Sequence, residues 1–225
     1  MHRAAANAVT RLPAMQTLTA DQPFWDRVAE KYAKQPVGDP AAFERKQAIT
    51  RELLTPGATV LEIGCGTGTL ALALAPAAGH IHSMDVSAEM IRIGNQKKAA
   101  LGVTNVTFHH GTLDAGAPVA PGGADAVWAY SILHLVDDRR RTLETLFDLL
   151  KPGGAFVSSN ACLGDSWVPY GALIALMRWF GKAPRVHIYG RCEILRELEE
   201  VGFVDIEEKD VGGDPRIAFI VAKKP

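Results

Sequence analysis

Short apolar segments alternate with helical segments over the central part of the chain, and this alternation constrains the fold more than any other feature. The sequence predicts strands at residues 58–64, 80–85, 105–110, 124–131 and 155–160. Apolar residues at helical spacing, stopped by Gly or Pro, fill most of the intervals between these strands. Because a helix between two strands forms a right-handed crossover that brings them into the same direction, the strands are expected to lie parallel with helices on both faces. The pattern predicts an α/β fold with a doubly wound, mostly parallel sheet.

The segments outside this region complete a single predicted domain. They predict helices at residues 23–34, 41–53, 167–180 and 192–203, and strands at 204–211 and 216–224. The sequence "GGDP" between the last two strands is typical of an antiparallel hairpin, which brings the expected sheet to seven strands. We expect one domain over residues 23–225, after a flexible leader at 1–22. Because the leader contains Arg3 and Arg11, a transit-like segment is a second interpretation of it, and Met15 is an alternative start of the chain.

Composition and charge exclude several classes of protein. The chain has 225 residues, of which 48% are hydrophobic and 22% charged, and its net charge is −1, so it has no general attraction to nucleic acid. Its longest apolar run is too short to span a membrane. Cys65, Cys162 and Cys192 lie far apart and form neither a CxxC pair nor a cluster with histidine. We expect a reduced, cytoplasmic protein without a metal site, as a monomer or a homodimer.

The segment "VLEIGCGTG" places Gly64, Gly66 and Gly68 between a buried strand and a helix. Bare backbone lets a ligand approach closely, and the N-terminus of the helix presents free N–H groups. A dinucleotide site would have its third glycine one position later, where this chain has Thr69. Glu62, at the end of the strand, would repel a pyrophosphate. It favours a ligand that carries a positive charge or an amine.

Asp85 ends the next predicted strand, in "MDVSAEM". A carboxylate at this position can accept hydrogen bonds from both hydroxyls of a ribose, in dinucleotide folds as well as in others. The alternative role for Asp85 is a helix N-cap. Because Ser87 can serve as the cap, ribose binding is favoured.

Five segments in order resemble the motifs of the class I S-adenosylmethionine-dependent methyltransferase family. They are "VLEIGCGTG", "MDVSAEM", "HHGTLDA", "DAVWAYSILHLVDD" and "LKPGGAFVSS". The resemblance extends from about Phe24 to the C-terminus and includes the terminal hairpin. It implies a Rossmann-like fold and an enzyme that transfers a methyl group from S-adenosyl-L-methionine to a small molecule, leaving S-adenosyl-L-homocysteine.

The resemblance also implies positions for the cofactor. The implied contacts are Glu62, Cys65 and the backbone of Gly64, Gly66 and Gly68 for the methionine part; Asp85 for the ribose; Val86, Met90, Thr112 and Leu113 for the adenine; and the backbone of Tyr130 for the amine. The family usually has an acid directly after the glycine of "HHG", and this chain has Thr112 there. Asp114 or the backbone N–H of Leu113 could take the place of this acid.

The segment "FWDRVAEKYAK" resembles the helix that closes over the cofactor in small-molecule members of the family. Its candidate contacts are Trp25 and Tyr32, and both residues also lie on the apolar face of the predicted helix. Core packing is the favoured interpretation for Trp25. For Tyr32 core packing and cofactor contact stay equally open.

His134, in "SILHLV", is the candidate catalytic residue, because it follows the fourth strand near the expected position of the methyl group. Its near-neutral reference pKa suits a general base. The alternative is a histidine that packs against or caps the next helix. His109 and His110 are adjacent in a strand, so they are expected to face opposite sides rather than to bind a metal.

Residues 162–190 lie where the family inserts a cover over the substrate, and they are rich in apolar side chains. The interpretations are plain core or a dimer contact, a cover over a hydrophobic or aromatic acceptor, or, through residues 167–185, peripheral contact with a membrane. The sequence does not distinguish an O, N, C or S acceptor atom.

Two other functions fit parts of the sequence. An NAD-dependent oxidoreductase would use the same strand ends, but the early third glycine disfavours it. A non-catalytic S-adenosylmethionine-binding protein would keep the same cofactor residues. A nucleic-acid methyltransferase is disfavoured because the chain has no basic stripe and has "YSIL" after the fourth strand, where "NPPY" would be expected.

Overall fold

The computed structural model describes residues 21–225, so the predicted leader lies outside it except for its last two residues. Gln22 already belongs to the first helix. The helices are α1 (Gln22–Lys34), α2 (Pro40–Glu52), α3 (Thr69–Leu74), α4 (Ala88–Leu101), α5 (Arg139–Leu149), α6 (Tyr170–Trp179) and α7 (Arg191–Val201). The strands are β1 (Thr59–Ile63), β2 (His80–Asp85), β3 (Val106–His110), β4 (Ala124–Tyr130), β5 (Leu150–Ala161), β6 (Val204–Glu208) and β7 (Ile217–Lys223).

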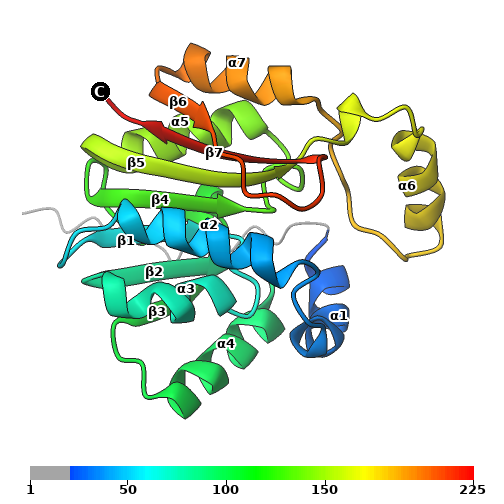
Figure 1. Ribbon diagram of the computed structural model, residues 1–225. Helices are drawn as coiled ribbons and strands as arrows, with labels where there is room; N and C mark the ends of the chain where they lie inside the picture. Colours follow the sequence, from blue (N-terminus) through cyan, green and yellow to red (C-terminus); the bar gives the residue numbers. More distant parts are fainter. Residues whose placement is uncertain (1–20) are drawn as a thin grey trace, which may run out of the picture.

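The strands form one seven-stranded sheet in the order β3-β2-β1-β4-β5-β7-β6 (Figure 1). All neighbouring strands from β3 to β5 are parallel, whereas β7 is antiparallel to both β5 and β6. This arrangement confirms the predicted Rossmann-like α/β fold and its antiparallel C-terminal hairpin. The chain moves outward from β1 to β3 and returns to β4 on the other side of β1. Such a reversal opens a crevice at the carboxyl ends of β1 and β4.

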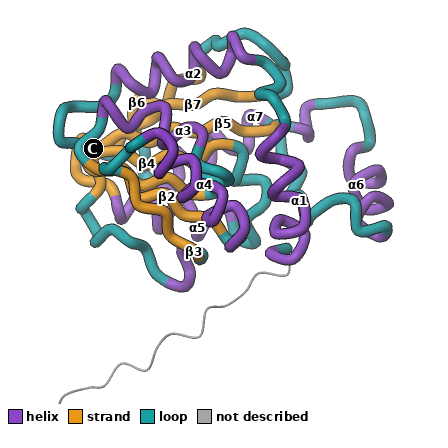
Figure 2. The backbone as a smooth tube through the Cα atoms, turned by 90° about the horizontal axis from the view of Figure 1, so that it is seen from below, coloured by secondary structure: helices purple, strands orange, loops and turns teal. Residues whose placement is uncertain are grey.

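Helices cover both faces of the sheet (Figure 2). Apolar residues of α5 and α7 pack with Leu61, Val127 and Phe156 in one core cluster. Residues of α2 and α3 pack with Val60 and Trp128 in a second cluster on the opposite face. Buried apolar layers on both faces explain why the central strands are nearly continuous in hydrophobicity.

The end of α3 and the start of β5 differ from the sequence prediction. Helix α3 ends at Leu74, and a 3₁₀ turn (Ala75–Ala77) that contains Pro76 follows it. Strand β5 begins at Leu150, because "PGG" forms a bulge inside the strand rather than a turn before it. Ala124 pairs with Leu150 and Ala126 with Ala155, which places the extra residues in β5.

Helix α6 stands away from the sheet beside α1, and the two views agree on this position (Figures 1 and 2). None of its residues is buried, so the core interpretation is wrong for α6, whereas Cys162 and Tyr189, near the two ends of residues 162–190, are buried in the core. The helix begins at Tyr170 rather than Trp167, and Trp167 is 93% exposed. Among residues 21–225, no helix combines the length and the hydropathy needed to cross a membrane.

Candidate active site

Two cavities lie at the carboxyl ends of β1 and β4. The Asp85 cavity has a volume of about 660 Å³, and the Lys46 cavity has a volume of about 790 Å³. Four residues line both cavities: Tyr32, Gly64, Tyr130 and Ser131. The site therefore consists of two adjoining compartments that meet at the end of β1.

The three glycines after β1 all have positive φ angles, of 64° at Gly64, 54° at Gly66 and 74° at Gly68. A Cβ at Gly64 would lie 2.5 Å from Ile132 Cγ1, and one at Gly68 would lie 2.2 Å from Phe108 Cζ. The close approach is thus made largely by the chain's own side chains. Both glycines are required by backbone conformation and packing, irrespective of any ligand.

Asp85 fixes the loop that carries these glycines. Its Oδ2 accepts a hydrogen bond from Gly66 N at 2.8 Å, and its Oδ1 accepts one from Ser87 N at 2.9 Å. The N-cap of α4 is Ser87, whose Oγ accepts from Met90 N at 3.1 Å. The carboxylate lines the Asp85 cavity, and burial raises its pKa. Asp85 is therefore not the helix cap, and each oxygen keeps a lone pair for a ligand.

Glu62 is 2% exposed at the end of β1 and borders the Lys46 cavity. Its Oε2 accepts a hydrogen bond from Ser83 Oγ at 2.7 Å. Burial is the main cause that raises the pKa of Glu62 to about 8, and the charge of Asp85 acts in the same direction. The group is thus mostly protonated at neutral pH, and a cation placed beside it would favour its ionised form.

The other predicted cofactor residues separate between the two cavities. Val86, Met90, Thr112, Leu113 and Gly66 line the Asp85 cavity, and Cys65 lines the Lys46 cavity. Gly68 lines neither cavity, because it packs against Phe108. Burial raises the pKa of the Cys65 thiol, which keeps it protonated and unreactive.

Helix α1 lies over the junction of the two cavities. Asp26 anchors it, because Asp26 Oδ1 accepts from Ser87 Oγ at 2.6 Å and from Glu89 N at 3.2 Å. Trp25 packs against an apolar cluster and also lines the Asp85 cavity. Tyr32 is 50% exposed and lines both cavities, so it is not a core residue.

His134 lines the Asp85 cavity, and its Nδ1 is buried without a hydrogen-bond partner in the part of the chain that the structure describes. Its backbone carbonyl accepts from His187 N at 2.7 Å. Burial lowers the pKa of His134 to about 4, so the ring is neutral at pH 7 but only weakly basic. Its role as the general base stays a prediction.

This pKa predicts a pH dependence of stability. The pKa of His134 is about 4 in the folded chain and about 6.5 when unfolded, so the unfolded state binds more protons between these values. The free energy of unfolding should therefore fall by about 2 kcal/mol from pH 7 to pH 5 through this residue. Urea unfolding at both pH values measures the change, and H134Q should remove this part of it. Equal pH dependence in wild type and variant would contradict the prediction.

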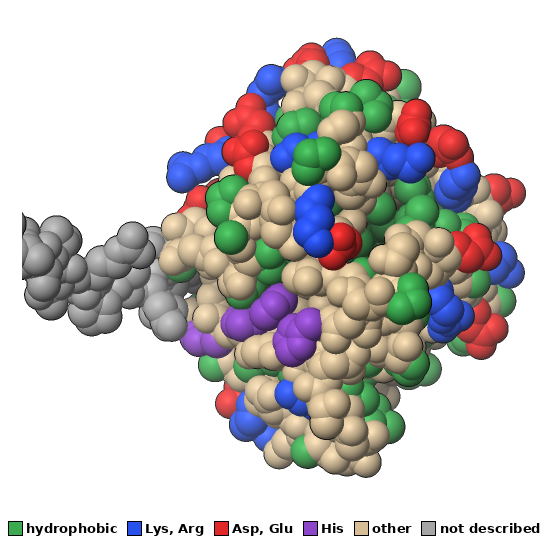
Figure 3. Space-filling model, turned by 90° about the vertical axis from the view of Figure 1, so that its left-hand side faces the viewer, with side chains coloured by type: hydrophobic (Ala, Val, Ile, Leu, Met, Phe, Trp, Pro, Cys, Tyr) green, Lys and Arg blue, Asp and Glu red, His purple; other side chains and the backbone are tan. Residues whose placement is uncertain are grey.

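Other histidines gather on one face of the molecule (Figure 3). His82 Nδ1 lies 3.1 Å from His109 Nε2, whereas His110 Nε2 lies 3.0 Å from the carbonyl of Val86. His109 and His110 therefore point in different directions, as expected for adjacent strand residues. Within residues 21–225, no group of three or more His, Cys, Asp or Glu side chains could hold a metal ion.

Three residues of the site were not found from the sequence. Asp26 anchors α1, Lys46 lines the second cavity, and Ser131 lines both cavities. Ser131 has φ of 53°, a conformation that costs a non-glycine residue energy and is concentrated at functional sites. Only the position of Ser131, directly after β4, could have drawn attention to it.

Comparison with known proteins agrees with this geometry. Residues 60–154 match a methyltransferase domain family. The demethylmenaquinone methyltransferase of Geobacillus kaustophilus (strain HTA426) is 30% identical in an alignment 185 positions long, which covers 73% of this chain and 79% of that protein. The chain therefore belongs to the class I S-adenosylmethionine-dependent methyltransferase family. It is an enzyme of methyl transfer, and its cofactor is S-adenosyl-L-methionine.

More distant similarities concern part of the chain or its fold. The ubiquinone biosynthesis O-methyltransferase of Xanthomonas campestris pv. campestris (strain B100) is 29% identical over 116 residues, 52% of this chain and 48% of that protein. Phosphoethanolamine N-methyltransferase 2 of Haemonchus contortus, solved with S-adenosyl-L-methionine, superposes with a TM-score of 0.73 at 16% identity, covering 93% of this chain and 61% of that one. A possible histamine N-methyltransferase from Thermotoga maritima gives a TM-score of 0.67 at 18% identity, covering 90% and 99%.

Proposed function

We propose that this methyltransferase binds the adenosine part of its cofactor in the Asp85 cavity and a small aromatic acceptor in the Lys46 cavity. The observation that carries the proposal is that the two cavities meet at Gly64, Tyr130 and Ser131. A cofactor that crosses this junction would present its methyl group to the second compartment. The acceptor would enter from the side opposite the sulfur, as an in-line displacement requires.

The residues present fit S-adenosyl-L-methionine in charge and shape. Asp85 offers carboxylate oxygens to the ribose hydroxyls, and the backbone from Gly64 to Gly68 offers a bare surface. Val86, Met90, Thr112 and Leu113 would surround the adenine. Glu62, Cys65 and the backbone of Tyr130 would face the methionine part, and Tyr32 would close over it.

The bound cofactor supplies an electrophilic methyl group on a sulfonium. The chain would then orient the acceptor and exclude water. An electron pair of the acceptor forms the new bond to the methyl carbon, and the electrons of the broken C–S bond stay on sulfur. A proton that the acceptor loses passes to water, or to His134 if the predicted base acts.

Glu62 predicts a proton release on cofactor binding. Its pKa of about 8 means that most molecules carry this proton at pH 7, and the cationic amine of the ligand should lower that pKa. Binding of S-adenosyl-L-homocysteine at pH 7 should therefore release up to about one proton. Calorimetry in buffers of different ionisation enthalpy measures it. E62Q should abolish the release, and a wild-type enthalpy independent of buffer would contradict the prediction.

The acceptor class rests on the relatives and on the cavity. One relative is named for demethylmenaquinone and another for ubiquinone biosynthesis, so both names refer to quinones. The Lys46 cavity combines apolar residues such as Phe43 and Ile217 with many polar and charged ones, among them Lys46, and this mixture suits an aromatic ring with oxygen substituents. The test is incubation with S-adenosyl-L-methionine and 1,4-dihydroxynaphthalene under anaerobic conditions. A product heavier by one methylene supports the proposal, and S-adenosyl-L-methionine left unconsumed with this and related phenols opposes it.

Residues 167–185 support a second element of the proposal, contact with the surface of a lipid bilayer. Trp167, Trp179 and Phe180 are 93%, 84% and 67% exposed, and Leu173 and Leu176 are about half exposed. An exposed apolar patch of this kind, on a helix with no buried residue, marks a surface that contacts a membrane or another molecule.

The charges around helix α6 indicate that this contact is with a lipid surface. The segment from Trp167 to Arg185 contains Arg178, Lys182 and Arg185 but no acidic residue, so its charge complements anionic lipid headgroups. An aromatic acceptor that carries an apolar chain would itself dissolve in a bilayer. Contact of α6 with that surface would bring the enzyme to such an acceptor.

A further inference from the structure

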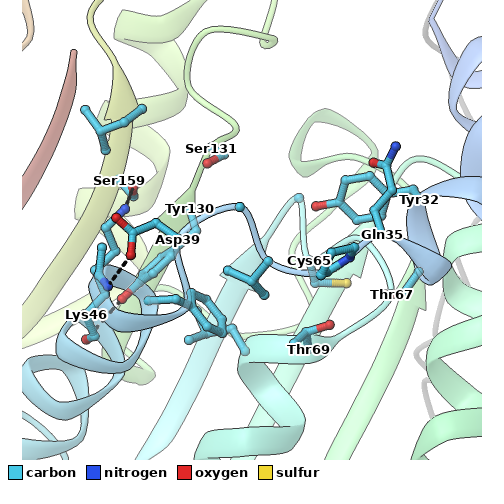
Figure 4. Close-up of a pocket in the computed structure, with 18 of the residues that line it drawn as sticks. Tyr32, Gln35, Asp39, Lys46, Cys65, Thr67, Thr69, Tyr130, Ser131 and Ser159 are labelled. Atoms are coloured by element: carbon cyan, nitrogen blue, oxygen red, sulfur yellow. Dashed lines mark hydrogen bonds between the residues drawn. The ribbon is translucent and has the colours of Figure 1, made fainter. Parts of the chain in front are cut away.

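Lys46 lies on α2 at the wall of the Lys46 cavity, next to the end of β5 (Figure 4). Its Nζ donates to Ser159 Oγ at 2.9 Å, and Ser159 is 2% exposed. A chain of hydrogen bonds holds this turn of α2: Tyr130 Oη lies 2.6 Å from Thr50 Oγ1, which donates to the carbonyl of Lys46 at 2.7 Å. The position of the ammonium group is therefore fixed by β4 and β5.

The ammonium group has donors to spare. Lysine has three N–H donors, and within residues 21–225 Ser159 is the hydrogen-bond partner of its Nζ, with no carboxylate within 4.0 Å. Burial lowers the pKa of Lys46, and the nearby charge of Asp39 opposes that shift only in part. A partly desolvated cation with free donors at a cavity wall is a binding site for an anionic oxygen.

The carboxylate of the cofactor's methionine part is the other anion that Lys46 could bind. Lys46 and the glycine loop, however, lie on opposite sides of the cavity. Figure 4 shows Lys46, Ser159 and Tyr130 on one side of the cavity, and Cys65, Thr67 and Thr69 of the glycine loop and its helix on the other. Lys97, which also lines the cavity, donates to Thr67 Oγ1 at 2.7 Å and so lies at the loop. Lys97 is therefore near the proposed position of the methionine carboxylate, and Lys46 is near the proposed position of the acceptor.

We propose that Lys46 Nζ binds the ionised oxygen of the methyl acceptor, which makes the acceptor a phenol or hydroquinone bound as its phenolate. The inference rests on the proposed placement of cofactor and acceptor. The hydroxyl proton leaves to water when the acceptor binds, and Lys46 stays protonated throughout. The phenolate then supplies the electron pair for the bond to the methyl carbon, from oxygen or from a ring carbon. Lys46 stabilises the nucleophile without exchanging a proton with it.

The experiment uses 4-nitrophenol, because its ionised form absorbs visible light. The full chain is saturated with S-adenosyl-L-homocysteine, and the absorbance of the bound phenol is titrated with pH. With wild type, the pKa of the bound phenol should fall by about one unit relative to the free phenol, a tenfold preference for the phenolate. K46M should raise that pKa above the free value, since the oxygen then meets a cavity without its cation. K46R should keep most of the shift, and K223M, at an exposed lysine of β7 that lines neither cavity, is the matched control that should leave it unchanged.

Calorimetry with S-adenosyl-L-homocysteine separates the outcomes. Cofactor affinity in K46M within threefold of wild type, together with the lost shift, supports the proposal. A tenfold or larger loss of cofactor affinity in K46M would show that Lys46 binds the methionine carboxylate and would overturn it. No binding of 4-nitrophenol to the saturated wild type, or an unshifted pKa, would overturn it as well. No binding of S-adenosyl-L-homocysteine to wild type would instead reject the proposed cofactor placement. Circular dichroism and thermal melting establish that each variant is folded.

Discussion

Replacing Asp85 with alanine is expected to lower the affinity for S-adenosyl-L-homocysteine about 100-fold or more. The carboxylate is the proposed partner of two ribose hydroxyls, and hydrogen bonds to a charged group contribute about 1.5–3 kcal/mol each. Loss of both therefore corresponds to at least ~3 kcal/mol, and about 1.4 kcal/mol is a factor of ten. The variant also loses the bonds that Asp85 accepts from Gly66 N and Ser87 N, which releases the glycine loop. Isothermal titration calorimetry measures the affinity.

Two controls isolate the ribose contact. D85N has nearly the same shape and keeps one acceptor oxygen, so it should lose less affinity than D85A. Asp205, which pairs with Lys223 on β6 and β7, lies in neither cavity, and D205A should bind as wild type does. An affinity of D85A within fivefold of wild type would exclude Asp85 as the ribose ligand.

Removing the two aromatic side chains at the end of α6 should release the protein from lipid vesicles. Trp179 and Phe180 are exposed and stacked on one another, with ring centroids 6.1 Å apart. Burying a large apolar side chain contributes about 1.5–3 kcal/mol, so W179A/F180A should weaken partitioning about 100-fold. Sedimentation with vesicles that contain anionic lipid, near which each Lys or Arg contributes about 1 kcal/mol, reports the bound fraction.

The matched control is L101A, because Leu101 is 65% exposed on α4 and lies outside residues 167–185. L101A should bind vesicles as wild type does, and R178E/K182E should weaken binding to anionic but not to neutral vesicles. Wild-type protein that stays in solution with every vesicle would reject membrane contact. If it also forms a dimer that W179A/F180A dissociates, a second copy covers α6 instead.

Local signals predicted most of the fold. Short apolar segments between helical segments located the five central strands, "GGDP" marked the last two, and Ser87 marked the start of α4 where the structure has it. These features depend on neighbours along the chain, which the sequence displays directly. The bulge at "PGG" was missed because its position depends on the pairing of β5 with β4.

The site was predicted less completely, because its geometry comes from distant segments. The glycine loop correctly indicated the carboxyl end of β1 as the site. Gly68, however, is required because it packs against Phe108, some forty residues later in the chain. Lys46 meets Ser159 across 113 positions of sequence, and nothing near either residue marks the pair. Helix α6 has the composition of a core helix, and only the structure places it outside the core.

The place of β7 in the sheet has a consequence for how the molecule is assembled. Among residues 21–225, strand β6 reaches the rest of the sheet only through β7, which follows it in sequence and pairs with β5 on its other side. During synthesis, β6 therefore has no edge to join until β7 has left the ribosome. The parallel half, from β3 to β5, can assemble earlier, but its β5 edge stays open to other chains until then. Completion of this edge is thus the last step in closing the sheet.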